Sequence, residues 1–197
     1  MVIPMNKPLF LFVGKSASGK TTIADILEKN YGYKQVSSYT TRLPRYDGEI
    51  GHVFVTDDEF DNIAVEDIVA YTEYNGYRYG TTAEQLDKCS VYVVDVPGVE
   101  TLLQNYKSNR RISIIYFDTT VFTRINRMLD RGDSDVRIIS RLLEDEKSDW
   151  YKQLDSLAWR YSHILNRHVE LHSVNANGNE TSVLEMILFY MNRDQED

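Results

Sequence analysis

Short apolar runs alternate with helix-like patterns along most of the chain. The first run, LFLFV at residues 9–13, ends at a glycine-rich loop, and apolar positions at helical spacing follow over residues 21–29. Later elements are expected, in order, at residues 91–94 (strand), 99–106 (helix), 112–117 (strand), 120–160 (helices), 169–174 (strand) and 181–191 (helix). Short continuous apolar runs are typical of strands buried on both faces of a parallel sheet. The alternation therefore predicts an α/β fold in which helices flank a parallel sheet.

Residues 36–82 break this alternation. Turn formers such as Pro44, Gly48 and Gly51 lie among many tyrosines and short alternating stretches, which indicates an insert on the sheet. Thr56 followed by Glu59 has the spacing of a capping box, so a short helix is expected to begin there.

The composition indicates one globular domain with a packed core. The chain has 197 residues, of which 42% are hydrophobic and 26% are charged. Its formal net charge of -8 disfavours a general nucleic-acid binder, because phosphate backbones are held mainly by excess lysine and arginine. A polyanionic ligand must therefore meet a local basic pocket.

Cysteine usage and hydropathy favour a soluble cytoplasmic protein. Cys89 is the single cysteine, which excludes an internal disulfide and fits a reducing compartment. The apolar run at residues 9–13 is too short to span a bilayer and has no basic leader or cleavage site beside it. We therefore expect neither a membrane nor a nucleic acid as a partner.

Residues 14–21, GKSASGKT, match the Walker A pattern of a phosphate-binding P-loop between a strand and a helix. Glycines let backbone N–H groups turn toward phosphate oxygens, and the helix N-terminus adds partial positive charge. Lys20 is expected to act as a catalytic residue that reaches the β- and γ-phosphates of ATP, and the Thr21 hydroxyl is expected to bind Mg²⁺. The predicted ATP-binding residues of this segment are Gly14, Ser16, Ala17, Ser18, Gly19, Lys20, Thr21 and Thr22.

Two alternatives accompany this interpretation. A chance match to the pattern has odds on the order of one in a hundred, and the flanking strand and helix lower them further. Asp95 ends an apolar strand at the edge where nucleotides bind in open α/β sheets. Asp95 is therefore expected either to hold a magnesium-bound water or to cap the next helix.

Three further segments carry specific motifs: VSSYTTRLPRYDGEIGHVFV from Val36, GYRYGT at residues 76–81, and the arginine-bearing stretch 127–141. With the P-loop, they resemble the guanylate kinase family of P-loop nucleoside monophosphate kinases, in the family's order, over residues 9–166. The resemblance implies one domain, 1–197, with a P-loop NTPase-type sheet core. That domain would comprise a core (1–35, 83–126 and 142–197), an acceptor-binding insert (36–82) and a helical lid (127–141).

The resemblance also implies that the insert binds the phosphate of the acceptor nucleotide. Arg42, Arg45 and Tyr79 occupy phosphate-binding positions of the family, and His52 stands where a phosphate-binding tyrosine is usual. Two guanidinium groups three residues apart can form several charge-assisted bonds to one phosphate. The alternative is two solvated surface arginines beside a proline turn.

The lid would supply the remaining positive charge. By resemblance, Arg127, Arg131 and Arg141 surround the transferring phosphoryl group as catalytic residues, and Arg127 and Arg131 have the spacing of one helical face. Arg124 extends the same face, and we expect it to be a solvated surface residue. Asn166 matches an asparagine that lies near the adenine of ATP in the family.

The base-reading positions depart from the family. Ser38 and Thr81 match small hydroxyl residues of the guanine pocket, but the guanine-binding glutamate aligns with Ala70. Glu73 lies an odd number of residues away, which points to the opposite face of an extended strand. A second guanine-binding aspartate has no counterpart, because the segment after the VYVVD strand is shortened. Alternatively, Glu73 or Glu100 enters the pocket through a local bulge.

The sequence therefore predicts Mg²⁺-dependent transfer of a phosphoryl group from ATP to a nucleoside monophosphate, with GMP or dGMP as the first choice. Two alternatives stay open. The chain is a kinase for another nucleotide or for a phosphorylated sugar such as ribose bisphosphate, or it is a catalytically silent interaction module of the same fold. An intact P-loop disfavours the silent module.

Overall fold

Four parallel strands form the core sheet of the computed structural model, which describes residues 7–45 and 47–196. Their order is β6 (Val91–Val93), β1 (Leu9–Val13), β7 (Ile112–Asp118) and β8 (Val169–Asn175). The register places Leu9 beside Ile112 and Ile112 beside Val169, so the carboxyl ends of the strands meet at one edge. The predicted α/β sheet is confirmed, while residues 1–6 and 197 of the predicted core lie outside the described residues.

Helices cover both faces of this sheet because its strands are apolar on both sides. In β1, Leu9 and Leu11 pack on one face and Phe10 and Phe12 on the other. Helices α4 (Val96–Asn105) and α7 (Trp150–Trp159) bury apolar residues on the Leu9 face. On the Phe10 face the covering helices are α1 (Lys20–Tyr31) and α8 (Glu180–Glu196). A buried leucine or phenylalanine typically contributes about 1.5–3 kcal/mol, so this two-sided packing holds the layers together.

A second four-stranded sheet lies within residues 38–82, inside the range predicted for the insert. Its order is β3 (His52–Phe54), β2 (Ser38–Thr40), β5 (Tyr77–Thr82) and β4 (Ile68–Tyr74), and only β2 and β3 are parallel. The predicted capping box is confirmed, since Thr56 and Glu59 cap helix α2 (Asp57–Asp61) reciprocally. A 3-10 turn at Val65–Asp67 leads into β4, and α3 (Ala83–Asp87) leads back to the core.

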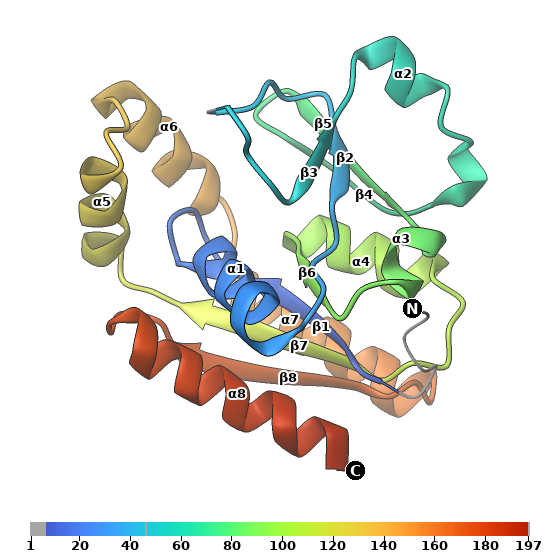
Figure 1. The fold of residues 1–197 in the computed structure, drawn as a ribbon. Coiled ribbons are helices and arrows are strands. Elements are labelled where there is room, and N and C mark those ends of the chain that lie inside the picture. Colours follow the sequence, from blue (N-terminus) through green and yellow to red (C-terminus); the bar gives the residue numbers. More distant parts are fainter. Residues whose placement is uncertain (1–6, 46, 197) are drawn as a thin grey trace.

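Two helices, α5 (Val121–Asp130) and α6 (Asp135–Asp145), stand beside the core at the same level as the second sheet. In Figure 1 they rise at the left, while the second sheet and α2 lie above the core and α8 lies below it. Gly132, at φ 79, ends α5 in a left-handed conformation that favours glycine, which allows the sharp turn between the two helices.

Most element boundaries agree with the sequence pattern. Helix α4 begins at Val96 rather than near residue 99, because Asp95 caps it and Pro97 occupies its first turn. The predicted helical stretch 120–160 divides into α5, α6 and α7, with a π-helical extension at Arg160–Ile164. Across the part of the chain that the structure describes, every helix is too short or too polar to cross a membrane.

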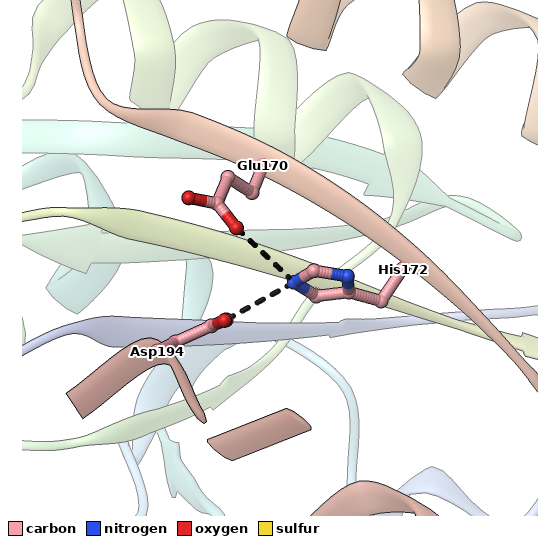
Figure 2. Close-up of side chains that lie close together, drawn as sticks. All are labelled: Glu170, His172 and Asp194. Carbon is pink, nitrogen blue, oxygen red and sulfur yellow. Dashed lines mark hydrogen bonds and ion pairs between the residues drawn. The ribbon is translucent and has the colours of Figure 1, made fainter. Parts of the chain in front are cut away.

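A buried polar network fixes the end of α8 to the sheet. Asp194 is only 2% exposed, and its Oδ2 accepts a hydrogen bond from Ser113 Oγ at 2.6 Å and one from His172 Nε2 at 3.0 Å. Glu170 Oε2 lies 3.6 Å from the same imidazole nitrogen, as Figure 2 shows. The guanidinium of Arg193 lies 3.7 Å from Glu170, so a cation of the chain already offsets these two carboxylates. The network therefore anchors the last turns of α8.

We expect Asp194→Ala to lower the free energy of unfolding by about 2–4 kcal/mol, because Ser113 and His172 lose a buried acceptor. Urea denaturation followed by circular dichroism measures this. A variant as stable as the wild type would contradict the anchoring role.

Candidate functional site

A cavity of about 580 Å³ opens between the core sheet, the second sheet and the pair α5–α6. It lies at the carboxyl ends of β1 and β6, the edge at which open α/β sheets bind ligands. All eight residues predicted to bind ATP in the glycine-rich loop contribute to its wall: Gly14, Ser16, Ala17, Ser18, Gly19, Lys20, Thr21 and Thr22. Its volume is in the range of small-molecule sites.

The glycine-rich loop has a shape that only particular residues allow. A Cβ on Gly14 would lie 2.8 Å from Ser18 Oγ and 2.9 Å from the Phe117 Cβ, so this position has no room for a side chain. Gly19 has φ 98, and Ala17 holds a left-handed conformation at φ 62 without being glycine. Such backbone strain persists where the surrounding structure enforces it, and it often marks functional loops.

The ammonium group of Lys20 is folded into this loop. Its Nζ donates to the carbonyl oxygen of Lys15 at 3.0 Å, to Ser18 Oγ at 3.1 Å and to the carbonyl oxygen of Gly14. Burial lowers the pKa of Lys20 to about 8, while the carboxylate of Asp145 opposes that shift. Lys20 therefore stays protonated at neutral pH and presents a weakly hydrated cation to the cavity.

Arg124 is not the solvated surface residue that its helical spacing predicts, and that prediction is wrong. The residue is fully buried. Its Nη2 pairs with Asp145 at 3.0 Å, its Nη1 with Glu146 at 3.1 Å, and its Nε donates to the carbonyl oxygen of Ser16 at 3.1 Å. The face of α5 that carries these arginines is turned toward the glycine-rich loop, and a helical pattern does not say which way a face is turned.

Arg127 joins two loops beside the glycine-rich wall of the cavity. Its guanidinium donates to backbone carbonyl oxygens of Ala17, Ser18, Ala176 and Gly178, at 2.8–3.4 Å. These bonds tie the glycine-rich loop to the β8–α8 connection. Because its guanidinium nitrogens already bond to these oxygens, Arg127 is placed to shape the site, and contact with a phosphoryl group would require it to exchange partners.

Arg131 and Arg141 reach the cavity as the resemblance predicts. Arg131 pairs with Asp133, whereas Arg141 makes no hydrogen bond or ion pair with any residue that the structure describes. Burial and the neighbouring cation of Arg131 lower the pKa of Arg141. Two guanidinium groups therefore converge on one wall without full compensation.

The segment 38–82 brings four of the six residues predicted to bind the acceptor to the cavity: Ser38, Arg45, His52 and Tyr79. Arg42 is 8% exposed, and its two outer nitrogens donate to Glu49 at 2.8 and 3.1 Å. Thr81 is fully buried and donates to the phenol oxygen of Tyr92 at 2.9 Å. The structure does not bring Arg42 and Thr81 to the wall of the cavity.

His52, which stands in place of a tyrosine, is neutral in this setting. Burial first, and the charge of Arg42 second, lower its pKa to about 4. Its Nδ1 lies 3.0 Å from Ser38 Oγ, and its ring lies 5.7 Å from the ring of Tyr79. His52 therefore adds to the cavity wall a group that can form hydrogen bonds, without adding charge.

No carboxylate replaces the missing glutamate from the places that the sequence suggests. Glu73 is exposed and accepts a hydrogen bond from the hydroxyl of Tyr71 at 2.6 Å, and Glu100 is also exposed. Strand β4 does have a register shift between Ile68 and Ala70, but that shift does not bring Glu73 into the cavity.

Tyr92 lies close to Ala70, because Thr81 pairs with Ala70 and bonds to Tyr92. Ala70 is 1% exposed, pairs with Thr81 across the strands, and belongs to the same apolar cluster as Tyr92. The Tyr92 ring also lines the cavity, and its hydroxyl receives the Thr81 bond. A phenol therefore lies next to the position where the family carries its guanine-binding carboxylate.

Asp95 lies on the cavity wall with both carboxylate oxygens engaged. Oδ1 accepts from the backbone N–H of Gly98 at 2.9 Å, which caps α4, and Oδ2 accepts from Thr72 Oγ1 at 2.8 Å. The capping alternative is therefore present in the structure. Each carboxylate oxygen can accept a second interaction, so a role toward a metal-bound water stays a prediction.

Asn166 is not at the site. It is exposed, has φ 49, and precedes β8, so it lies at the opposite edge of the sheet from the cavity. The segment that follows β8 lies at the cavity instead, with Ala176, Gly178 and Glu180 on the wall. The prediction rested on the match to an asparagine of the family, and that match was misleading. The rule that ligands bind at the carboxyl ends of parallel strands pointed to residues 175–180.

Asp145 is the main site residue that sequence reasoning missed. It lines the cavity although it is 1% exposed, and Ser16, Tyr74 and Arg124 all bond to its carboxylate. Asp145 and Ile138 are the buried residues of α6 and lie two helical turns apart. An acidic residue at a position of the apolar stripe was the available signal.

Comparisons with known proteins bear on the fold of the chain. No family model matches the chain. A guanylate kinase of Fusobacterium nucleatum is 30% identical over 84 residues, which cover 41% of this chain and 45% of that protein. The chain therefore matches less than half the length of this curated relative.

Among solved structures, guanylate kinase from Anaplasma phagocytophilum superposes with a TM-score of 0.59 at 19% identity, over 100% of this chain and 90% of that one. An identity this low supports a shared fold, and the superposition extends over the whole chain. The chain therefore has the guanylate kinase-like fold that its sequence motifs predict.

Proposed function

We propose that this protein is a kinase that transfers the γ-phosphoryl group of ATP to a nucleoside monophosphate. The observation that carries the proposal is the convergence of Lys20, Arg45, Arg131 and Arg141 on one cavity beside an intact glycine-rich loop. Phosphoryl transfer demands mainly positioning and charge neutralisation, and these side chains supply both.

The donor side would hold ATP through the glycine-rich loop. Backbone N–H groups at the start of α1 and the Lys20 ammonium would bind the β- and γ-phosphates. The Thr21 hydroxyl, exposed at the cavity, and Asp95 fit a magnesium ion, since hydroxyl and carboxylate oxygens are its preferred ligands. When bound, Mg²⁺ would neutralise negative charge on the phosphates of ATP.

The acceptor side would hold a phosphate dianion with Arg45 and Tyr79. Burial, followed by the charges of Arg42 and Arg141, lowers the pKa of Arg45 to about 10, which reports crowding of positive groups. An incoming phosphate relieves that repulsion. Arg42 would join the grip only by exchanging its partner Glu49.

In the transfer step, an oxygen of the acceptor phosphate forms a bond to the γ-phosphorus as the bond to the β-phosphate oxygen breaks. The acceptor is already a dianion, so no proton has to be removed. Arg131 and Arg141 would stabilise the charge that spreads over the equatorial oxygens. Closure of α5, α6 and the second sheet would exclude water from the γ-phosphate.

The base of the acceptor is the part of the site that differs most. The relatives' names and the sequence resemblance favour GMP or dGMP. Buried Ala70 and the Tyr92 phenol beside it supply no carboxylate for guanine. The same observation favours a second candidate, a kinase for another nucleotide or for a phosphorylated sugar, which needs no base reader.

We expect Arg45→Ala to raise KM for the acceptor with little change in KM for ATP. Of the two substrates, Arg45 would contact only the acceptor, through its phosphate. Loss of one partner of a desolvated charge pair typically costs about 2–5 kcal/mol. Arg42→Ala should mainly lower stability, since Glu49, with 5% of its side chain exposed, loses its two bonds to Arg42 and keeps, among the residues described, only Arg45 as a cationic partner, at 3.5 Å. Initial rates at varied acceptor concentrations measure this, and an unchanged acceptor KM for Arg45→Ala would remove that residue from the site.

A panel of acceptors tests the proposed reaction and its base. We expect magnesium-dependent turnover of at least one of GMP, dGMP, AMP, CMP, UMP and dTMP, with a preference for guanine well below the roughly 10⁴–10⁵ that a dedicated hydrogen-bonding site gives. Lys20→Ala is the inactive control. Turnover of ribose bisphosphate alone would support the sugar kinase. No turnover of any acceptor would support the silent module.

A further inference from the structure

A buried ion pair holds both backbone polar groups of Ser16. The Ser16 N–H donates to Asp145 Oδ2 at 2.8 Å, and its carbonyl oxygen accepts from Arg124 Nε at 3.1 Å. The two side chains meet each other at 3.0 Å between Arg124 Nη2 and Asp145 Oδ2. One residue of the glycine-rich loop is thus gripped from both sides by α5 and α6.

This pair is unusual for its burial. The side chains of Arg124 and Asp145 are each 1% exposed. Removing two charges from water costs several kcal/mol each, so such a pair is weak evidence of added stability. A role in fixing the local structure is therefore the better explanation for its presence.

The bonds of Ser16 reach Lys20 through a single peptide group. The Lys15–Ser16 peptide donates its N–H to Asp145, while its C=O accepts from Lys20 Nζ at 3.0 Å. A trans peptide is planar, and its C=O and N–H point in opposite directions. A bond that fixes the N–H toward Asp145 therefore also fixes the C=O toward the Lys20 ammonium.

We propose that Arg124 and Asp145 are positioning residues: they orient the Lys15–Ser16 peptide and thereby hold the Lys20 ammonium and the glycine-rich loop ready for the phosphates of ATP. Asp145 acts through Ser16, because its Oδ2 accepts from the Ser16 N–H and from Arg124, and its Oδ1 accepts from the hydroxyls of Tyr74 at 3.3 Å and Ser16 at 3.4 Å. This inference rests on the proposed binding of ATP.

A purely structural ion pair is the competing explanation, and the chain offers a matched control. Asp194 is 2% exposed, is a buried carboxylate bonded to polar side chains as Asp145 is, and lies in the α8 network away from the cavity. Loss of either carboxylate should lower stability. Loss of Asp145 alone should disturb the glycine-rich loop.

The experiment compares Asp145→Ala with Asp194→Ala in the full chain. Calorimetric titration measures the affinity for Mg²⁺·ATP, and hydrogen exchange measures protection of the Ser16 amide. We expect Asp145→Ala to bind ATP at least about tenfold more weakly and to exchange the Ser16 amide faster, because the loss of one charge-assisted hydrogen bond frees the peptide. Asp194→Ala should keep both wild-type values.

The double variant Arg124→Leu with Asp145→Ala separates the two explanations further. Removing both charges avoids an unpaired buried ion and should recover much of the stability. ATP affinity should stay low, because the grip on Ser16 is gone. Recovery of ATP affinity together with stability, or an unchanged affinity in Asp145→Ala, would overturn the proposal.

Two further outcomes have defined meanings. If the wild type fails to bind Mg²⁺·ATP, the proposed function fails. The exchange rate of the Ser16 amide then tests by itself whether Asp145 holds the loop. Equal exchange rates in the wild type and both variants would overturn the positioning role of Asp145. If Asp145→Ala does not fold, Asp145→Asn and Asp194→Asn provide the same comparison with smaller expected effects. An Asp145→Asn variant with wild-type exchange and wild-type ATP affinity would overturn the proposal.

Discussion

The site depends on holding several cations close together next to a loop of backbone N–H groups. Lys20, Arg45, Arg131 and Arg141 line one cavity in a chain whose net charge is -8. Burial, followed by repulsion from neighbouring cations, lowers the pKa values of Lys20, Arg45 and Arg141. Such a cluster is stable only if the surrounding structure enforces it. A bound polyanion would offset the electrostatic repulsion between the cations.

The arginines divide into two groups by what surrounds them. Arg42 and Arg124 are buried, pair with Glu49 and Asp145, and stay off the cavity wall. The arginines on the wall have less compensation or bond to backbone carbonyls, as Arg127 does. The buried pairs thus fix the shape of the insert and of the glycine-rich loop, and the wall presents the charge. The acidic residues Glu49 and Asp145 thus contribute to an anion-binding site by fixing the structure around it.

The sequence predicted the parts of this arrangement that depend on local pattern. The β1 strand and the capping box at Thr56 follow from apolar runs and residue spacing, and the structure has both. Arg124 was misplaced, because helical spacing shows that residues share a face but not what that face meets. Its partner Asp145 is 21 residues away, and only tertiary packing brings the two together.

The base pocket shows the same limit. The sequence revealed that Ala70 removes a carboxylate, but the Tyr92 ring that packs beside it comes from another sheet. Asn166 was placed by its match to an asparagine of the family, whereas the structure sets it at the far edge of the core. The strands predicted from apolar runs agree with the fold, but the placement of Asn166, which rested on the family match alone, does not.

The central claim is that one cavity takes ATP and a monophosphate end to end. Its most direct test is the affinity of a bisubstrate analogue in which five phosphates join adenosine to guanosine, measured by calorimetry against ATP with Mg²⁺ present. Linking two ligands that fit adjoining sites raises affinity by about 10²–10⁴. The account predicts that the analogue binds at least about 100-fold more tightly than ATP. An analogue that binds no more tightly than ATP would contradict it.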